Sequence, residues 1–353
     1  MHRYLDALIA DLDAALPLVR GRTVNSVFFG GGTPSLIPAL AMEELLGSLR
    51  ARLNLAPNCE ITLESNPGTF EKESYQAFRT SGITRLSIGI QSFHDEFLQS
   101  LGRVHDREQA LAAASEATQI FDTFNLDLMY ALPGQTLDDV RQDVSTALSL
   151  APSHLSIYHL SIEPHTLFAK YPPQLPDDDT AADMLDLITN MTDEAGMQRY
   201  EVSAYAKPGH ACQHNLNYWQ FGDYLGIGAG AHSKLSFANR VLRQVRFSEP
   251  LQYMREALSG QGVSQENEVS AADLPFEFML NALRLKDGFS LALFENRTGL
   301  ALTAIQHSLE AAERQGLLER DGTFVKPTAR GFDFLCDLQL LFLNQSDSDI
   351  HPR

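Results

Sequence analysis

Strand-like apolar runs alternate with helical segments along the first half of this chain, and this alternation most constrains the fold. Short strands are expected at residues 25–29, 61–64, 85–90, 125–129 and 154–160. The intervals carry helical spacing of leucine or alanine, as in residues 38–53, 107–121 and 137–150. Strict alternation of this kind favours a parallel sheet, either as a barrel or as a doubly wound layer.

Polar residues and a glycine turn follow these strand-like runs where each run ends. The first run leads into Gly30, Gly31, Gly32, Thr33 and Pro34. Later runs lead to Glu64, Gln91 and Asp127, and Arg103 follows the third run. In parallel sheets the functional groups gather at the carboxyl ends of the strands. Taken as a set, these residues favour a ligand site over isolated structural roles.

Each of these residue types suits one part of a polar ligand. The glycine turn lacks side chains, so a ligand can approach its amides and carbonyls closely. Glu64 and Asp127 could accept hydrogen bonds from hydroxyl or amino groups, and Arg103 offers a planar fork for a carboxylate. Gln91 can donate and accept at once, which suits a ribose. The alternative is structural, with a tight turn at the glycines and a polar network between the strands.

The middle of the chain is rich in glycine and aromatic residues. Residues 171–180 read as a linker, a helix is expected up to about residue 193, and a further strand at 200–205. The segment from His214 to Trp219 contains Asn215, Tyr218 and the only tryptophan of the chain. Imidazole can ligate heme iron, and aromatic rings can pack on a porphyrin. The alternative is a loop anchored by its aromatic side chains.

The last part of the chain changes from alternation to helices followed by a hairpin. The helical pattern begins at Leu274, and residues 318–325 contain a turn signal at Asp321 and Gly322. This order predicts a small winged-helix-like domain. We therefore expect three parts, at residues 1–170, 171–270 and 271–353.

Charge and composition exclude several function classes. The 353 residues carry a net charge of −18, which opposes nucleic-acid binding because that binding depends on neutralising phosphates. Three dispersed cysteines do not form a disulfide framework. The sequence contains no run of 18 or more uncharged apolar residues, which a membrane span would require, and no signal peptide is evident. We expect a cytoplasmic protein that does not span a membrane.

The motifs together resemble a known family of radical S-adenosylmethionine (SAM) proteins. The stretches FFGGGTPSL, ITLESNPGT, RLSIGIQSF, LGRVHD and DLMYALPGQT resemble successive signatures of the oxygen-independent coproporphyrinogen III oxidase-like family. HNLNYW, YLGIGAGAHS and FEFMLNALRL are similar to its heme chaperone branch, HemW. The resemblance covers essentially the whole chain.

The resemblance implies a fold and a set of cofactors. It implies an incomplete (β/α)6 TIM-like barrel without its first strand, followed by a winged-helix-like domain. Gly31, Gly32, Thr33, Glu64, Gln91, Arg103 and Asp127 match the SAM contacts of the family, and the stretch around His214 matches its heme motif. The family also holds a 4Fe-4S cluster on a Cys-x3-Cys-x2-Cys loop, which this chain lacks. We expect no metal ligands and no catalytic residue in the chain as given, and a shortened start at Met1.

Three functions follow from this resemblance. The first is heme trafficking, in which the protein binds heme near His214 and delivers it to membrane or respiratory proteins. The second is radical-SAM decarboxylation of coproporphyrinogen in porphyrin biosynthesis, which requires the cluster. The third is a SAM-binding paralogue without catalysis. His159, His165, His210 and His232 are alternative heme ligands. The radical-SAM membership leaves enzymatic activity open, and we favour a chaperone without oxidase activity.

Overall fold

The computed structural model describes residues 2–68, 75–164 and 166–343. These residues form two compact units. One unit consists of residues 24–213, and the other consists of the residues before 24 together with those after 213. Each unit is described separately below.

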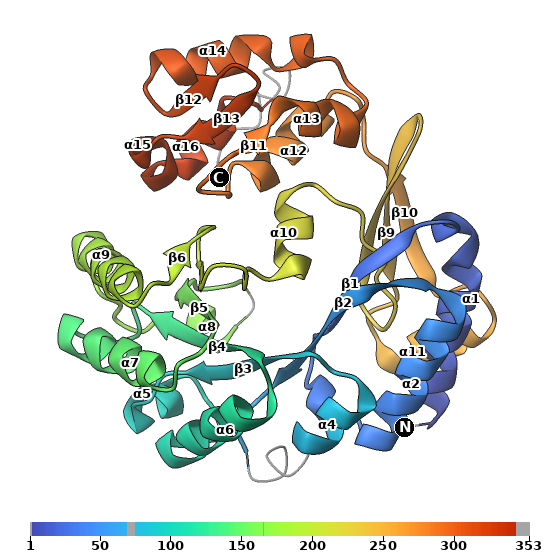
Figure 1. Cartoon of the computed structure of the whole chain (residues 1–353), viewed down its shortest axis with the longest axis horizontal. Coiled ribbons are helices and arrows are strands. Elements are labelled where there is room, and N and C mark those ends of the chain that lie inside the picture. Colours follow the sequence, from blue (N-terminus) through green and yellow to red (C-terminus); the bar gives the residue numbers. More distant parts are fainter. Residues whose placement is uncertain (1, 69–74, 165, 344–353) are drawn as a thin grey trace. The chain divides into compact units, whose positions relative to one another are not determined.

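A curled sheet of seven strands forms the centre of the unit at residues 24–213 (Figure 1). Its strands, in spatial order, are β1 (Thr23–Phe29), β2 (Asn54–Ser65), β3 (Arg85–Gln91), β4 (Thr123–Tyr130), β5 (His154–His159), β7 (Ala204–Ala206) and β6 (Gln198–Arg199). Strands β2 to β5 pair in parallel, whereas β7 runs antiparallel to both β5 and β6. The sheet is therefore an incomplete barrel with a parallel centre.

Helices cover the outer face of this sheet (Figure 1). They are α2 (Ala39–Arg52), α4 (Tyr75–Ser81), α5 (Asp95–Ser100), α6 (Arg107–Ile120), α7 (Leu137–Ser149) and α9 (Asp178–Glu194), whereas the short α8 (Leu167–Lys170) follows β5 and buries no residue. Leu86, Ile88 and Ile90 of β3 are fully buried and alternate with Arg85, Ser87 and Gly89. Because successive strand residues point to opposite faces, the apolar set and the polar set face different sides of the sheet. The predicted α/β barrel is confirmed; residues 71–74 of one expected helix lie outside the described residues.

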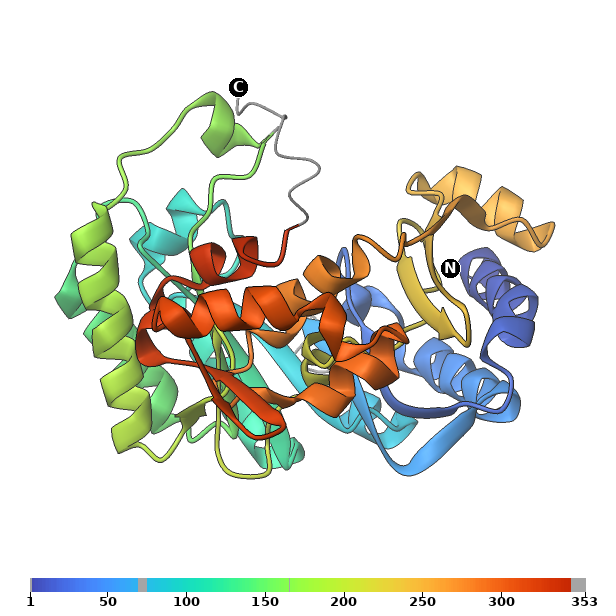
Figure 2. The same cartoon turned by 90° about the horizontal axis from the view of Figure 1, so that it is seen from above.

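The second unit contains α1 (His2–Val19), α10 (Gln213–Trp219) and an antiparallel sheet made of β8 (His232–Phe237), β9 (Arg240–Arg246) and β10 (Val263–Glu268). Helix α1 packs against α11 (Pro250–Leu258), as Figure 2 shows in dark blue and light orange. A buried ion pair between Asp11 and Arg246 joins α1 to β9. Leu5, Leu8 and Leu12 are buried on one side of α1.

The chain ends in a helical and hairpin domain within the same unit. Its elements are α12 (Leu274–Ala282), β11 (Phe289–Ser290), α13 (Leu291–Thr298), α14 (Gln306–Arg314), β12 (Leu318–Asp321), β13 (Phe324–Pro327), α15 (Ala329–Asp333) and α16 (Leu335–Leu340). The predicted winged-helix-like arrangement is confirmed, with β13 between β11 and β12. Asp321 pairs with Phe324, so the connecting residues are Gly322 and Thr323, one position later than expected. The predicted domain limits at 170 and 270 stay predictions.

None of the helices in the described ranges is long and apolar enough to cross a membrane.

Candidate functional site

The carboxyl ends of the parallel strands bring the predicted polar residues to one edge of the barrel unit. Glu64 lies one residue before the end of β2, Gln91 is the last residue of β3, and Asp127 lies in the second half of β4. Glu64 pairs with Ser87 across β2 and β3, and Ser87 pairs with Asn125 across β3 and β4. Since the three strands are parallel and in this register, the side chains of Glu64, Ser87 and Asn125 form one row.

The glycine turn lies directly beside Glu64. The backbone N–H of Gly31 donates a hydrogen bond to Glu64 Oε2 at 3.2 Å. Gly31 has a φ of +106°, a conformation that favours glycine. A Cβ at Gly30 would lie 2.8 Å from the Phe28 ring and 3.1 Å from Glu64 Oε2, whereas positions 31 and 32 are open. Gly31 and Gly32 are exposed, and Thr33 is half-buried. The turn is therefore an accessible backbone surface beside a carboxylate.

Two carboxylates and one guanidinium interact electrostatically at this edge. Burial raises the pKa of Glu64, the negative charge of Asp127 raises it further, and the Gly31 N–H opposes the shift. Burial also raises the pKa of Asp127, against the hydrogen bonds that it accepts from Asn125 and Ser87. Desolvation lowers the pKa of Arg103, and the Asp127 charge opposes that change. The edge therefore presents both signs of charge in a poorly solvated setting.

Gln91 has an unusual backbone conformation at this edge. Its φ is +67°, in the left-handed region that non-glycine residues rarely adopt. A Cβ on the neighbouring Gly89 would lie 3.2 Å from both Gln91 Nε2 and Asn66 Oδ1. Arg103 Nη1 donates to the same Asn66 Oδ1 at 3.4 Å. Gly89 thus leaves room for three converging polar side chains. Asn66 and Gly89 were not predicted as site residues, although both lie inside the motifs that flank Glu64 and Gln91.

A residue of helix α7, Asp143, stabilises the turn after Gln91 through hydrogen bonds. Asp143 accepts a hydrogen bond from the Phe93 N–H at 2.7 Å and another from Ser92 Oγ at 2.7 Å. Burial raises the pKa of Asp143 to about 6, and these two hydrogen bonds oppose the shift. A strained backbone persists only where its surroundings fix it. Asp143 supplies that support, and nothing in its helical sequence context indicated it.

Tyr158 is a further residue at this edge that the sequence did not indicate. It follows the buried part of β5, and its side chain is 43% exposed. Burial of its hydroxyl raises the pKa of Tyr158 to about 12, and the charges of Asp127 and Glu64 contribute. Tyr158 therefore places an accessible aromatic ring within electrostatic range of both carboxylates.

The predicted heme motif forms a short helix, α10, with adjacent aromatic rings. The rings of His214 and Tyr218 have centroids 4.9 Å apart, and Tyr218 stacks on Tyr224 at 4.3 Å. The Arg284 guanidinium lies 4.2 Å from the centroid of the Trp219 ring. His214, Asn215, Tyr218 and Trp219 are all half-buried. Because residues four apart share one face of a helix, His214 and Tyr218 present their rings on the same side.

The other histidines and the three cysteines have separate positions. His159 packs edge-on against Tyr130, His210 contacts Thr123 Oγ1 at 3.4 Å, and His232 is exposed at the start of β8. His165 lies outside the described residues. Cys59 and Cys212 are buried and Cys336 is exposed. Within the described part of the chain, no group of three or more His, Cys, Asp or Glu residues could hold a metal ion. The cysteines present therefore do not fit a 4Fe-4S cluster.

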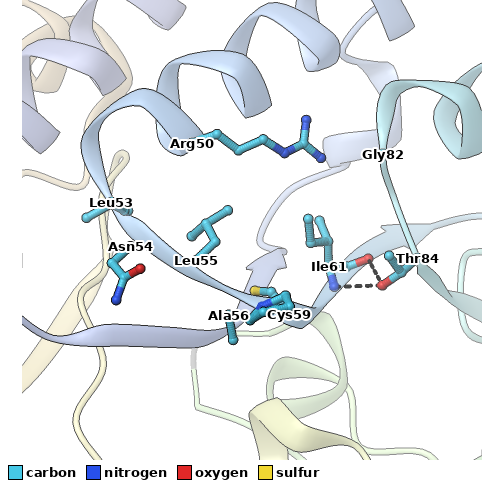
Figure 3. A pocket seen from close by; sticks show the side chains of 10 residues that line it. Arg50, Leu53, Asn54, Leu55, Ala56, Cys59, Ile61, Gly82 and Thr84 are labelled. Atoms are coloured by element: carbon cyan, nitrogen blue, oxygen red, sulfur yellow. Dashed lines mark hydrogen bonds between the residues drawn. The ribbon is translucent and has the colours of Figure 1, made fainter.

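A separate pocket of about 460 Å³ lies where β2 begins (Figure 3). Arg50 extends over it from α2, while Cys59 and Ile61 line it from β2, and Thr84 hydrogen-bonds the Ile61 backbone. Burial raises the pKa of the Cys59 thiol. The pocket contains none of the predicted site residues, so it is distinct from the edge described above.

Comparisons with known proteins match both parts of the chain. The model of the radical SAM superfamily matches residues 4–147, and that of the HemN C-terminal domain matches residues 269–334. A protein named heme chaperone HemW from Escherichia coli K12 is 44% identical, over 96% of this chain and 89% of its own length. The protein of that name from Haemophilus influenzae is 42% identical, over 98% and 90%. The one from Mycobacterium tuberculosis H37Rv is 36% identical, over 93% and 83%.

A solved structure has the same fold. The structure described as coproporphyrinogen III oxidase (HemN) from Escherichia coli, a radical SAM enzyme, aligns with a TM-score of 0.80. The alignment covers 97% of this chain and 82% of that one, at 23% identity. At this identity the likeness supports the barrel and the C-terminal domain, and it leaves the activity open.

Proposed function

Because this chain belongs to the radical SAM superfamily, and within it to the HemW family, we propose that it is a heme chaperone that binds SAM and heme. The similarity to HemW proteins over nearly the full length of the chain carries this proposal. We place the protein in the cytoplasm and propose that it delivers heme to membrane or respiratory proteins. The proposed function includes no catalytic use of SAM and no binding of nucleic acid.

The proposed SAM site is the carboxyl edge of the barrel unit. Gly31, Gly32 and Thr33 would face the methionine part of SAM, whose amino and carboxylate groups suit exposed backbone and mixed charges. Glu64, Gln91 and Asp127 supply acceptors for hydroxyl or amino groups, and Arg103 supplies the cation. The open positions at Gly31 and Gly32 support this fit, because no side chain covers the turn. When bound, SAM supplies an activated sulfonium centre.

The proposed heme site is the aromatic face of α10. The rings of Tyr218 and Tyr224 stack on each other, the His214 ring lies against Tyr218 at an interplanar angle of 58°, and His214 offers an imidazole for iron. Asn215 and Trp219 share the next face of the same helix and belong to the proposed set. The donor chemistry fits heme, and His214 is half-buried.

The superfamily also implies a 4Fe-4S cluster. The cysteines in the described part of the chain do not come together as a ligand set, so the proposed function does not depend on a cluster. The alternative function is the decarboxylation of coproporphyrinogen in porphyrin biosynthesis. Relatives that share over a third of their residues with this chain are named heme chaperones, whereas the structure named as the oxidase shares 23%. That difference favours the chaperone.

Titration with hemin tests the proposal. Wild-type protein should bind about one equivalent, and His214→Ala should weaken binding at least about tenfold, because loss of an axial imidazole removes the strongest contact to iron. His307→Ala is the matched control, since His307 is exposed on α14, is not one of the candidate ligands and should leave heme affinity unchanged. Equal affinity of His214→Ala and wild type would refute the proposed heme site. Absence of saturable hemin binding by folded wild type would refute the chaperone function.

A further inference from the structure

A continuous hydrogen-bonded network lies behind Asp127 in the barrel unit. It consists of Ser87, Asn125, His154 and Tyr200, together with Ser156, whose Oγ donates to Asn125 Oδ1 at 3.1 Å. Ser87, Asn125 and His154 are 7%, 1% and 0% exposed, so water does not solvate them. They come from β3, β4 and β5 in one register, with Asn125 paired to Ser87 on one side and to His154 on the other. Buried polar groups at these positions cost free energy unless each has a partner.

The distances assign one direction to every hydrogen bond of this network. The Asn125 amide nitrogen lies 2.7 Å from Asp127 Oδ1 and 2.8 Å from Ser87 Oγ, so it donates to both. The opposite amide orientation would place an oxygen 2.7 Å from a carboxylate oxygen, where two acceptors repel each other. Asn125 Oδ1 therefore points the other way and accepts from His154 Nδ1 at 2.7 Å.

The same logic fixes the histidine and the tyrosine. Because Nδ1 of neutral His154 carries the proton, its Nε2 must accept, and the Tyr200 hydroxyl donates to it at 2.8 Å. That hydroxyl accepts in turn from the Cys212 N–H at 3.4 Å. At the other end, Ser87 Oγ donates to Asp127 Oδ2 at 3.2 Å. All donors therefore point along the network toward the Asp127 carboxylate.

Charges around the network favour a neutral histidine, and burial raises the pKa of Asp127 while its hydrogen-bond donors and Arg85 oppose that rise. Desolvation, the Arg85 charge and His210 lower the pKa of His154 well below its usual value. Arg85 is 3% exposed, and its Nε has no hydrogen-bond partner. Its charge acts on Asp127 and lowers the pKa of that carboxyl, against the effect of burial. Glu64, Arg103 and Tyr158 are the other ionisable groups that interact with Asp127.

We propose that Asn125 and His154 are positioning residues that fix the orientation and the negative charge of Asp127, with Tyr200 setting the tautomer of His154. The fixed carboxylate can then accept hydrogen bonds from the hydroxyl or ammonium donors of a ligand. This inference rests on the proposed assignment of Asp127 to the SAM site. Asn125, His154 and Tyr200 are remote from the exposed edge and act on it through Asp127.

The test follows the Asp127 carboxyl directly, by 13C NMR titration of protein labelled at aspartate Cγ. Asp127→Asn identifies the Asp127 signal. Asn125→Ala should raise the pKa of Asp127 by about one pH unit or more, because the carboxylate loses a buried donor. Tyr200→Phe and His154→Leu should raise it by smaller amounts, and His154→Asn, which keeps a donor toward Asn125, should restore part of the loss. Ser81→Ala is the matched control, since it removes a buried hydrogen bond to the Phe78 carbonyl on α4 and should leave Asp127 unchanged.

SAM titration of the same variants connects the network to binding. In Asn125→Ala the affinity for SAM should fall as pH falls through the raised pKa of Asp127, whereas a general loosening of the fold would lower it equally at every pH. An unchanged Asp127 pKa in folded Asn125→Ala would overturn the proposal. Should Asn125→Ala fail to fold, an unchanged pKa in both Tyr200→Phe and His154→Leu would overturn it. Wild type that binds no SAM would refute the proposed SAM site, while the NMR titration would still decide the network.

Discussion

The buried ion pair between Asp11 and Arg246 is expected to contribute strongly to the stability of the unit that contains α10. Both side chains are almost fully buried, at 3% and 1% exposure. Arg246 Nε lies 3.3 Å from Asp11 Oδ1, and the Tyr253 hydroxyl donates to Asp11 Oδ2 at 2.9 Å. Arg246 also donates to Ser233 at 2.7 Å. Removal of Asp11 would therefore leave a guanidinium buried without its counter-ion.

The expected magnitude follows from that uncompensated charge. Breaking a buried ion pair by removing one partner costs about 3–5 kcal/mol. With a urea dependence of about 2 kcal/mol per molar, Asp11→Ala should lower the unfolding midpoint by roughly 1.5–2.5 M. Replacing both partners, as in Asp11→Leu with Arg246→Met, should recover most of this loss, because no charge stays buried.

Trp219 provides the assay, because it is the only tryptophan in the chain and belongs to the same unit. Its fluorescence in urea reports unfolding around α10 in that unit. Glu256→Ala is the matched control, since its partner Arg255 is 67% exposed and such pairs contribute about 1 kcal/mol or less. A midpoint for Asp11→Ala that equals that of Glu256→Ala would refute the reasoning.

Three further predictions concern the barrel unit. Gly30→Ala should weaken SAM binding at least about tenfold, because its Cβ would lie within 3.1 Å of both Phe28 and Glu64. An unchanged affinity for SAM in a calorimetric titration would contradict this prediction. Gly47→Ala, on an exposed and open position of α2, should stabilise the protein by about 0.5–1 kcal/mol in urea unfolding, and a loss of stability would count against the helix assignment. Burial raises the pKa of Asp143 to about 6 in the native state, above its value in the unfolded chain. Between pH 4 and 6 the native state therefore binds more protons at this group than the unfolded state does. The free energy of unfolding should for this reason fall as the pH rises from 4 to 6. Asp143→Asn should remove that part of the slope, and an identical pH dependence in the variant would exclude the effect.

The sequence predicted the barrel because its periodicity is local. Apolar runs such as Leu86, Ile88 and Ile90 alternate with polar residues, and the intervening helices bury one stripe each. The antiparallel direction of β7 was not predictable from that pattern, because strand direction depends on which neighbour a short segment meets. The turn between β12 and β13 lies one residue later than predicted. The pairing of Asp321 with Phe324 sets its register, and turn propensity alone does not.

The position of the candidate site residues near strand ends was predictable from the sequence, while their ligand roles stay predictions. Glu64, Gln91 and Asp127 stand at those ends, and the parallel register explains why they share one edge. The supporting residues could not be found in this way. Asp143 comes from a distant helix, and His154 and Tyr200 connect to Asp127 only through Asn125. Such partners depend on tertiary proximity, which a single sequence does not encode as a local signal.

Transfer of heme to an acceptor tests the central claim most directly. Protein loaded with hemin would be mixed with vesicles that carry a heme-free respiratory cytochrome, and the Soret band would be followed by stopped flow. We expect transfer to be faster than the release of heme to apomyoglobin, with the advantage lost in His214→Ala. Transfer at the same rate as this passive release would contradict the chaperone function.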